Sequence, residues 1–188
     1  MPERSKGTAW KAVGREIGTW VRIPLPPPLF IGDSVVTIDL NEVEEYLQGC
    51  SDETRIYLGC DSRVFYNSHR DRMVSYTTAI VVHIDGCRGG KLFYQNDVEH
   101  DRSPSRKKPS VRLMTEVYKV SDLYLRLIDE VDSCIEKDIE IHLDVNPKQE
   151  YKSSAIISEA LGYIRGVCQT EAKVKPEAWA ASTVADAF

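Results

Sequence analysis

Four acidic side chains lie at sequence positions where a charged group would need a compensating cation or would be approached closely by another part of the molecule. Asp61 ends a short strand-like run, and Glu116 falls inside the apolar arc of an amphipathic helix. Asp144 lies in the middle of the alternating run 139–146, and Asp186 lies on the small-residue side of a terminal helix. A carboxylate on a buried surface is costly unless a cation compensates it. We therefore expect these four side chains to share compensating cations.

If the four carboxylates converge on one face of a sheet, they form a ligand set made of oxygen alone. Oxygen ligands favour Mg²⁺ or Mn²⁺, whereas zinc is typically held by His and Cys. Two such ions about 4 Å apart activate a water molecule and stabilise the leaving oxygen of an in-line phosphodiester displacement. The carboxylates therefore predict nuclease chemistry that uses two divalent ions.

Three of the four carboxylates also have a purely structural interpretation. Asp61 would then be a turn former or a helix cap. Glu116 would lie at the margin of the apolar stripe and pair with Arg112 or Lys119. Asp186 would be a solvated residue near the end of a fraying helix. No single residue decides between the two interpretations, and the case for a metal site rests on the combination.

The elements that must position these residues follow from hydrophobic periodicity and from turn residues. The order predicts an α/β fold whose mixed sheet has three antiparallel strands followed by parallel strands, with helices beside it. The expected elements are a helix at 40–48, strands at 55–61, 73–84 and 91–94, a long helix from Ser110 to about 137, a strand at 139–146, a helix at 153–165, a strand at 172–175 and a terminal helix with Pro176 at its first position.

Length and composition bound the remaining possibilities. The 188 residues, with 42% hydrophobic and 28% charged, fit one domain with its own core. Five cysteines without a CxxC pair argue against a disulfide framework or a thiolate zinc site. No apolar run is long enough to span a bilayer, and residues 1–6 lack the pattern of a signal peptide. We therefore expect a cytoplasmic protein with no membrane partner.

The net charge of −5 is unevenly distributed. Residues 1–30 hold five basic and two acidic side chains, so this Trp- and Pro-containing arm and linker carry +3 and the remaining 158 residues carry −8. We divide the chain into this arm and a domain at 31–188. The arm is expected to pack on the domain, on a protein partner or on a second copy, or to contact nucleic acid directly. A loop with Arg102, Arg106, Lys107 and Lys108 is expected to contact backbone phosphates, whatever the base sequence.

Several local motifs resemble the ribonuclease H-like superfamily, and in particular its YkuK-type branch of largely uncharacterised bacterial and phage proteins. The motifs span about residues 35–188, and the His-Leu-Asp-Val-Asn and Lys-Pro segments in this order are the most specific. They are Leu58-Gly59-Cys60-Asp61-Ser62, Glu116-Val117-Tyr118, Ile141-His142-Leu143-Asp144-Val145-Asn146, Lys152-Ser153-Ser154, Val174-Lys175-Pro176 and Val184-Ala185-Asp186.

The resemblance implies that Asp61, Glu116 and Asp144 are the first three metal ligands and that Asp186 is the fourth. His142 is expected on the same strand face as Asp144, where it would assist a water molecule or a leaving group, or orient a ligand. A single His on a strand is otherwise a structural residue. Lys152 and Lys175 are predicted to contact phosphates or to compensate the acidic cluster, the default being a solvated lysine.

Three functions remain open at this stage. The first is a nuclease dependent on Mg²⁺ or Mn²⁺ that cleaves RNA, RNA:DNA hybrids or structured DNA. The second is a catalytically inactive module of the same fold that binds nucleic acid or takes part in an assembly. The third is a structural partner protein that docks through its arm. The sequence does not decide which nucleic acid would be the substrate.

Overall fold

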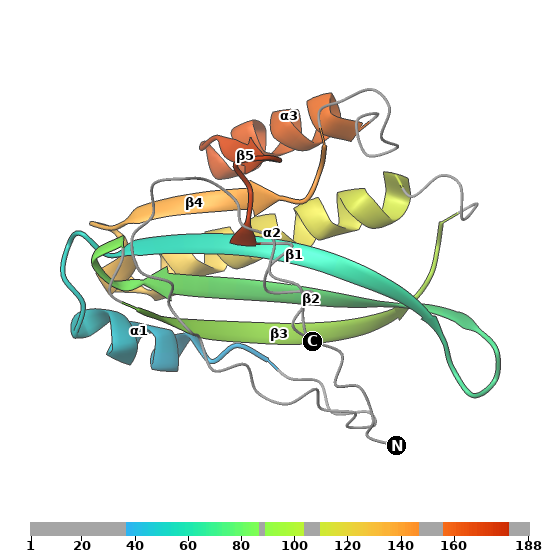
Figure 1. Cartoon of the computed structure of the whole chain (residues 1–188), viewed down its shortest axis with the longest axis horizontal. Helices are drawn as coiled ribbons and strands as arrows, with labels where there is room; N and C mark the ends of the chain where they lie inside the picture. The colour runs from blue at the N-terminus through green and yellow to red at the C-terminus, as the bar shows by residue number, and fades with distance from the viewer. Residues whose placement is uncertain (1–36, 87–88, 104–109, 147–155, 181–188) are drawn as a thin grey trace, which may run out of the picture.

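The computed structural model describes residues 37–86, 89–103, 110–146 and 156–180, and the predicted arm at 1–30 lies outside them. Five strands form one sheet in the order β3-β2-β1-β4-β5 (Figure 1). The first three strands pair antiparallel, and the last two add to β1 in parallel. The strands are β1 (Arg55–Tyr66), β2 (Arg72–His83), β3 (Gly90–His100), β4 (Asp138–Leu143) and β5 (Ala172–Val174). The predicted α/β fold with a mixed sheet is confirmed.

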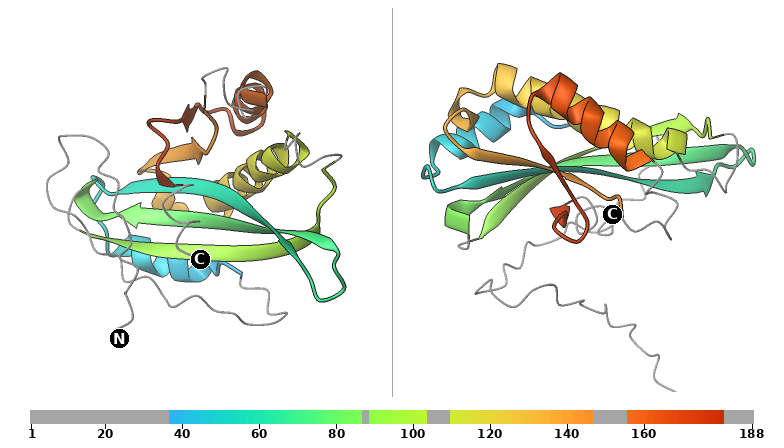
Figure 2. Two further views of the ribbon diagram at one scale, coloured as in Figure 1. Left: turned by 45° about the vertical axis from the view of Figure 1, so that its right-hand side comes forward. Right: turned by 90° about the horizontal axis from the view of Figure 1, so that it is seen from above.

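Three helices cover one face of the sheet, as Figure 2 shows in its right-hand view. They are α1 (Leu40–Gln48), α2 (Ser110–Glu130) and α3 (Ile157–Cys168), and the short 3₁₀ turns are η1 (Ile84–Gly86) and η2 (Asp132–Cys134). The side chain of Asp39 caps α1 by accepting a hydrogen bond from the Asn41 N–H at 2.9 Å. In the described part of the chain, none of the helices combines the length and the apolar character that crossing a membrane requires.

The main core lies between the helices and this face of the sheet, which we call the helix face. Ile56, Leu58 and Cys60 of β1 point into it, because residues two apart on a strand share a face. A smaller cluster on the opposite face holds Tyr57 of β1, Ala79 and Val81 of β2, and Ala180. The four cysteines that the structure describes are free thiols, and three of them are buried.

Three predicted strand boundaries are wrong by three residues or more, and two of these corrections affect the site. The strand predicted at 91–94 continues to His100 as β3, because β2 pairs with it along this length. β1 runs on to Tyr66, so Asp61 lies within the strand rather than at its carboxyl end. The extension forms because β2 continues alongside it and pairs with β1 down to the Tyr66↔Arg72 pair. In contrast, β4 ends at Leu143, so Asp144 follows the strand rather than standing in its middle.

Two predictions for helices also need correction. The long helix α2 ends at Glu130, not near 137, and η2 follows it. A contact distant in sequence fixes this turn, since Glu44 of α1 accepts hydrogen bonds from the Ser133 N–H at 3.0 Å and from its hydroxyl at 2.6 Å. Pro176 lies in a turn after a cis peptide bond and not at the start of a helix. The predicted terminal helix lies almost wholly outside the described residues.

Candidate active site

The parallel pairing of β1 with β4 places Asp61 beside Asp144. Cys60 pairs with Leu143 at the end of this ladder, and the two aspartates are the next residue on each chain. The Asp144 side chain is 18% exposed, and Asp61 is also partly buried. Two residues that are 83 positions apart in the sequence thus reach one point at the end of β4.

Glu116 approaches this point from α2, which packs against β1. The residue is only 4% exposed, so the prediction of a carboxylate on a buried helical stripe is confirmed. The Ser62 hydroxyl donates a hydrogen bond to Glu116 Oε1, and Arg112 Nη1 lies 3.3 Å from the same oxygen. Arg112 Nη1 also donates to the backbone oxygen of Ser62 at 2.9 Å, which ties α2 to β1 at this position.

The surroundings of Glu116 raise the pKa of its carboxyl group to about 8. Burial is the main cause, and the negative charges of Asp61 and Asp144 add to it, while the Ser62 hydrogen bond and the Arg112 charge act in the opposite direction. Loss of the proton from the Glu116 carboxyl group is therefore disfavoured in the metal-free protein. Such crowding of acidic groups in a buried place is typical of functional sites.

Among the described residues, Lys175 provides a cation that pairs with Asp144. Its ammonium group forms an ion pair with Asp144 Oδ1, and its backbone N–H donates to Val145 O at 3.1 Å. The turn after β5 therefore folds back onto the end of β4. Of the two roles expected for Lys175, the structure shows charge compensation of the acidic cluster.

His142 has a structural environment rather than a reactive one. It is 1% exposed, and its ring lies 5.2 Å from that of Tyr57 and 5.8 Å from that of Trp179, between centroids. Nδ1 accepts a hydrogen bond from the Ala180 N–H at 3.2 Å. Nε2 therefore carries the proton and donates a hydrogen bond to Glu140 Oε2 at 3.1 Å. Burial lowers the pKa of His142, which keeps the ring neutral. Both ring nitrogens are hydrogen-bonded, and His142 thereby links β4 to the segment after β5.

The carboxylates fit a hard divalent cation by their chemistry, since all the donors are oxygens. Within the described ranges, however, no group of three or more His, Cys, Asp or Glu side chains is arranged so that it could hold a metal ion. Asp186, the expected fourth ligand, lies outside these ranges. In the part of the chain that the structure describes, Asp61 and Asp144 are thus neighbours and their charges act on Glu116, but the three do not form a coordination shell.

The predicted phosphate-binding residues are mostly outside the described residues. Arg106, Lys107, Lys108 and Lys152 belong to this group, whereas Arg102 is exposed just after β3. Ser62 and Arg112 both bond to Glu116, and of the two only Arg112 was predicted as its partner. The one signal for Arg112 was its i,i+4 spacing from Glu116, and the Ser62 contact across 54 positions had no signal of that kind.

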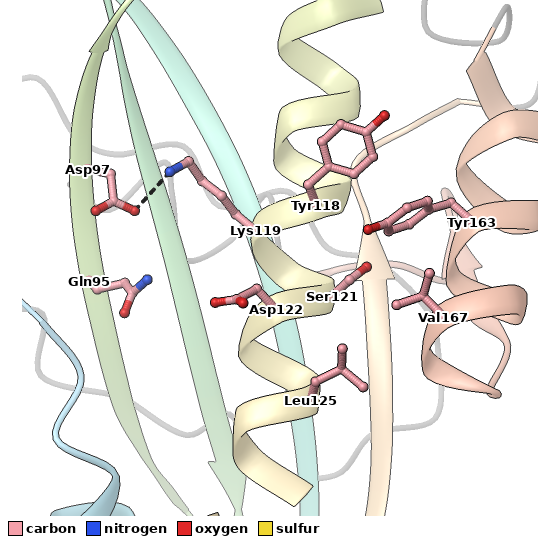
Figure 3. A pocket seen from close by; sticks show the side chains of 9 residues that line it. All are labelled: Gln95, Asp97, Tyr118, Lys119, Ser121, Asp122, Leu125, Tyr163 and Val167. Carbon is pink, nitrogen blue, oxygen red and sulfur yellow. Dashed lines mark hydrogen bonds and ion pairs between the residues drawn. The ribbon is translucent and has the colours of Figure 1, made fainter. Parts of the chain in front are cut away.

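A groove in the described part of the chain lies away from the carboxylates. Its volume is about 410 Å³, and it runs between β3, α2 and α3 (Figure 3). Tyr118 and Tyr163 meet edge to face at one side, with ring centroids 4.8 Å apart, and Lys119 pairs with Asp97 at 3.1 Å on the other. None of the predicted ligands lines this groove. The candidate site therefore lies apart from this groove, where β1 continues past the end of β4.

The fold and the cluster together define a class of protein. A sheet of three antiparallel and two parallel strands, with helices on one face and carboxylates from β1, α2 and the end of β4, is an α/β domain with an acidic centre. The family model described as ribonuclease H-like matches residues 40–188, and the chain belongs to this family. No curated protein and no solved structure gives a significant match. Family membership supports a nucleic-acid-related, nuclease-like function.

Proposed function

We propose that this protein is a nuclease that depends on Mg²⁺ or Mn²⁺ and hydrolyses phosphodiester bonds in RNA, RNA:DNA hybrids or structured DNA. The observation that carries the proposal is the buried Glu116 carboxyl group, 4% exposed, whose pKa is raised by burial and by the charges of Asp61 and Asp144. Three acidic groups in one neighbourhood repel one another, and divalent cations would remove this repulsion. Family membership supports the same class of substrate.

Asp61, Glu116, Asp144 and Asp186 would hold the ions in this proposal. Bound there, two divalent ions would activate a water molecule and stabilise the leaving oxygen. The other residues support this centre from the protein side. Arg112 and Ser62 hold the Glu116 carboxyl against β1, and Lys175 pairs with Asp144 in the absence of a metal ion. Arg102, with the basic residues near it in sequence, would contact substrate phosphates.

Cleavage of labelled RNA, DNA and hybrid duplexes, each with Mn²⁺, Mg²⁺ or EDTA, tests this proposal directly. We expect cleavage of at least one substrate with Mn²⁺ and none with EDTA. Asp144→Asn should abolish the cleavage while the protein stays folded. Undiminished cleavage by this variant would show that another site performs the chemistry.

A second candidate is a module of the same fold that binds nucleic acid without cleaving it. It is favoured by the Lys175–Asp144 ion pair, because a lysine that neutralises this aspartate does in part what a metal ion would do. Calorimetric titration with Mn²⁺ separates the two. Binding that is lost in both Asp61→Asn and Asp144→Asn supports the nuclease, and an absence of Mn²⁺ binding in the wild-type protein supports the module.

A further inference from the structure

The outer part of the β1–β2 hairpin carries residues that the carboxylate site does not use. β1 continues for five residues after Asp61, and β2 begins at Arg72. This end of the hairpin projects past the helices (Figure 1 and the left view of Figure 2). Phe65 is 36% exposed and Tyr66 is 50% exposed, which is unusual for two adjacent aromatic residues on a strand.

Strand alternation places part of this hairpin on the same face as Asp61. Arg63 and Phe65 follow Asp61 at spacings of two and four residues, so the three side chains form a row on one face. Directly opposed residues on β2 and β3 share that face and widen the row into a patch. We call this patch the hairpin platform, and it consists of Arg63, Phe65, Met73, Val98 and His100.

The hairpin platform combines exposed apolar surface with positive charge. Val98 is 54% exposed, and Arg63 and His100 are exposed as well. Residues 62–72 contain three arginines and one aspartate, a net charge of +2 in a protein of net charge −5. Arg72 forms an ion pair with Asp101 at 2.9 Å. Among the described residues, neither Arg63 nor Arg70 takes part in an ion pair.

The tip of the hairpin is held in a fixed shape by Asn67. Its side-chain oxygen accepts hydrogen bonds from the N–H groups of His69 at 3.0 Å and Asp71 at 2.8 Å. Asn67 also pairs with Asp71 through both backbone and side chain, and Arg70 takes the left-handed conformation at φ 65°. Because the Asn67 side chain holds the turn through hydrogen bonds, the hairpin has a defined shape before a ligand binds. Little conformational entropy is then lost on binding.

We propose that the hairpin platform binds a single-stranded segment of the nucleic-acid substrate, with Phe65 stacking on a base and Arg63 contacting a backbone phosphate. This proposal rests on the proposed function, since the row begins at Asp61 and places Phe65 about 13 Å along β1 from it. Bases stack on exposed aromatic side chains only where they are unstacked, which selects single strands over duplexes. The positive charge in an otherwise acidic protein favours a polyanion over a protein partner.

Fluorescence anisotropy in EDTA tests the hairpin platform without any cleavage. The probes are a labelled single-stranded 12-mer of RNA, the DNA equivalent and the matching hybrid duplex. We expect Phe65→Ala to weaken single-strand binding about 10-fold with an unchanged salt dependence. Arg63→Gln should weaken it less and lower the salt slope by about one. The matched controls Ile135→Ala and Arg126→Gln, which replace an exposed apolar residue and an exposed arginine elsewhere, should bind like the wild type.

The outcomes separate this proposal from the proposed function. If the variants bind as expected but the wild type cleaves nothing with Mn²⁺, the hairpin platform stands and the nuclease proposal fails. If the wild type cleaves while Phe65→Ala and Arg63→Gln bind and cleave as it does, the hairpin platform is overturned and the nuclease proposal stands. Equal losses in the control variants, or equal losses for single strands and duplex, also overturn the hairpin platform. Circular dichroism melts of each variant verify that it is folded.

Discussion

Both ends of β4 carry carboxylates, but water reaches only one of them freely. At the start of the strand, the Asp138 side chain is 58% exposed and pairs loosely with Arg55 at 3.7 Å. We call this region the exposed acidic end, and it is a hollow lined by Asp52, Glu53, Arg55, Asp85 and Asp138.

The region just past the other end of β4 is the buried acidic centre, formed by Asp61, Glu116 and Asp144. The Glu116 side chain is 5% exposed and that of Asp144 is 18% exposed. Charges interact weakly through water and strongly where water is excluded. The acidic groups of the buried acidic centre therefore act strongly on one another, and together with burial they raise the pKa of Glu116 to about 8. Burial, rather than the number of acids, distinguishes a candidate site from a solvated acidic surface.

The largest expected effect distinguishes the two ends of β4 by activity. Asp144→Asn should lower Mn²⁺-dependent cleavage at least about 100-fold. Loss of a residue that only orients a metal ligand typically costs about 10- to 100-fold, and loss of a ligand itself should cost more. The matched variant Asp138→Asn, at the exposed acidic end, should leave the rate unchanged. Initial rates on the best substrate measure both. A similar loss in both variants would mean that the buried acidic centre has no special role.

The second effect is a pH dependence of stability in the metal-free protein. Glu116 binds its proton more tightly in the folded state than in the unfolded state, whose pKa is near 4.5. Its stabilising contribution is therefore complete below about pH 4.5 and is lost as the pH rises to about 8, so the free energy of unfolding should fall by several kcal/mol over this window. Urea unfolding in EDTA at intervals of pH measures it. Glu116→Gln should flatten this decline, and the control Glu53→Gln should leave it in place.

The third effect compares two ion pairs on the same helix. Arg112–Glu116 and Arg126–Glu130 both have i,i+4 spacing and 3.3 Å between their charged atoms, but only the first is buried. Arg112→Ala should cost about 2 kcal/mol at pH 8, because it leaves Glu116 without its cation. Arg126→Ala should cost no more than about 0.5 kcal/mol. Chemical denaturation of the two variants gives both values, and equal costs would contradict the assigned role of Arg112.

The smallest effect concerns Lys175, whose ammonium group forms an ion pair with Asp144 in the metal-free protein. Lys175→Ala removes this competitor, so the affinity for Mn²⁺ should increase a few-fold, which corresponds to about 1 kcal/mol or less. Calorimetric titration of the variant measures the change. Lys173→Ala is the control, since Lys173 pairs with Glu140 instead. Weaker Mn²⁺ binding in Lys175→Ala would show that this lysine supports the ions rather than competing with them.

Much of the fold could be predicted because its signals are local. The helix at 40–48 was predicted to the residue from its N-cap and apolar spacing, and the order of strands follows from alternation and turn residues. Errors came where distant contacts set the boundary. β1 lengthens because β2 pairs with it past Asp61, and α2 stops at Glu130 before the turn that Glu44 binds through Ser133. Periodicity in one segment does not contain this information.

The sequence by itself determined which groups could do chemistry and that Glu116 would be buried, since its position on the helical wheel places it among apolar residues whatever the rest of the fold. Only the tertiary structure decided what those groups meet. The β1–β4 register brings Asp61 to Asp144, the turn after β5 pairs Lys175 with Asp144, and the Ala180 N–H donates a hydrogen bond to His142 Nδ1. The reason is physical: burial is fixed by local periodicity, whereas the charge and hydrogen-bond partners of a buried group come from chain segments distant in sequence.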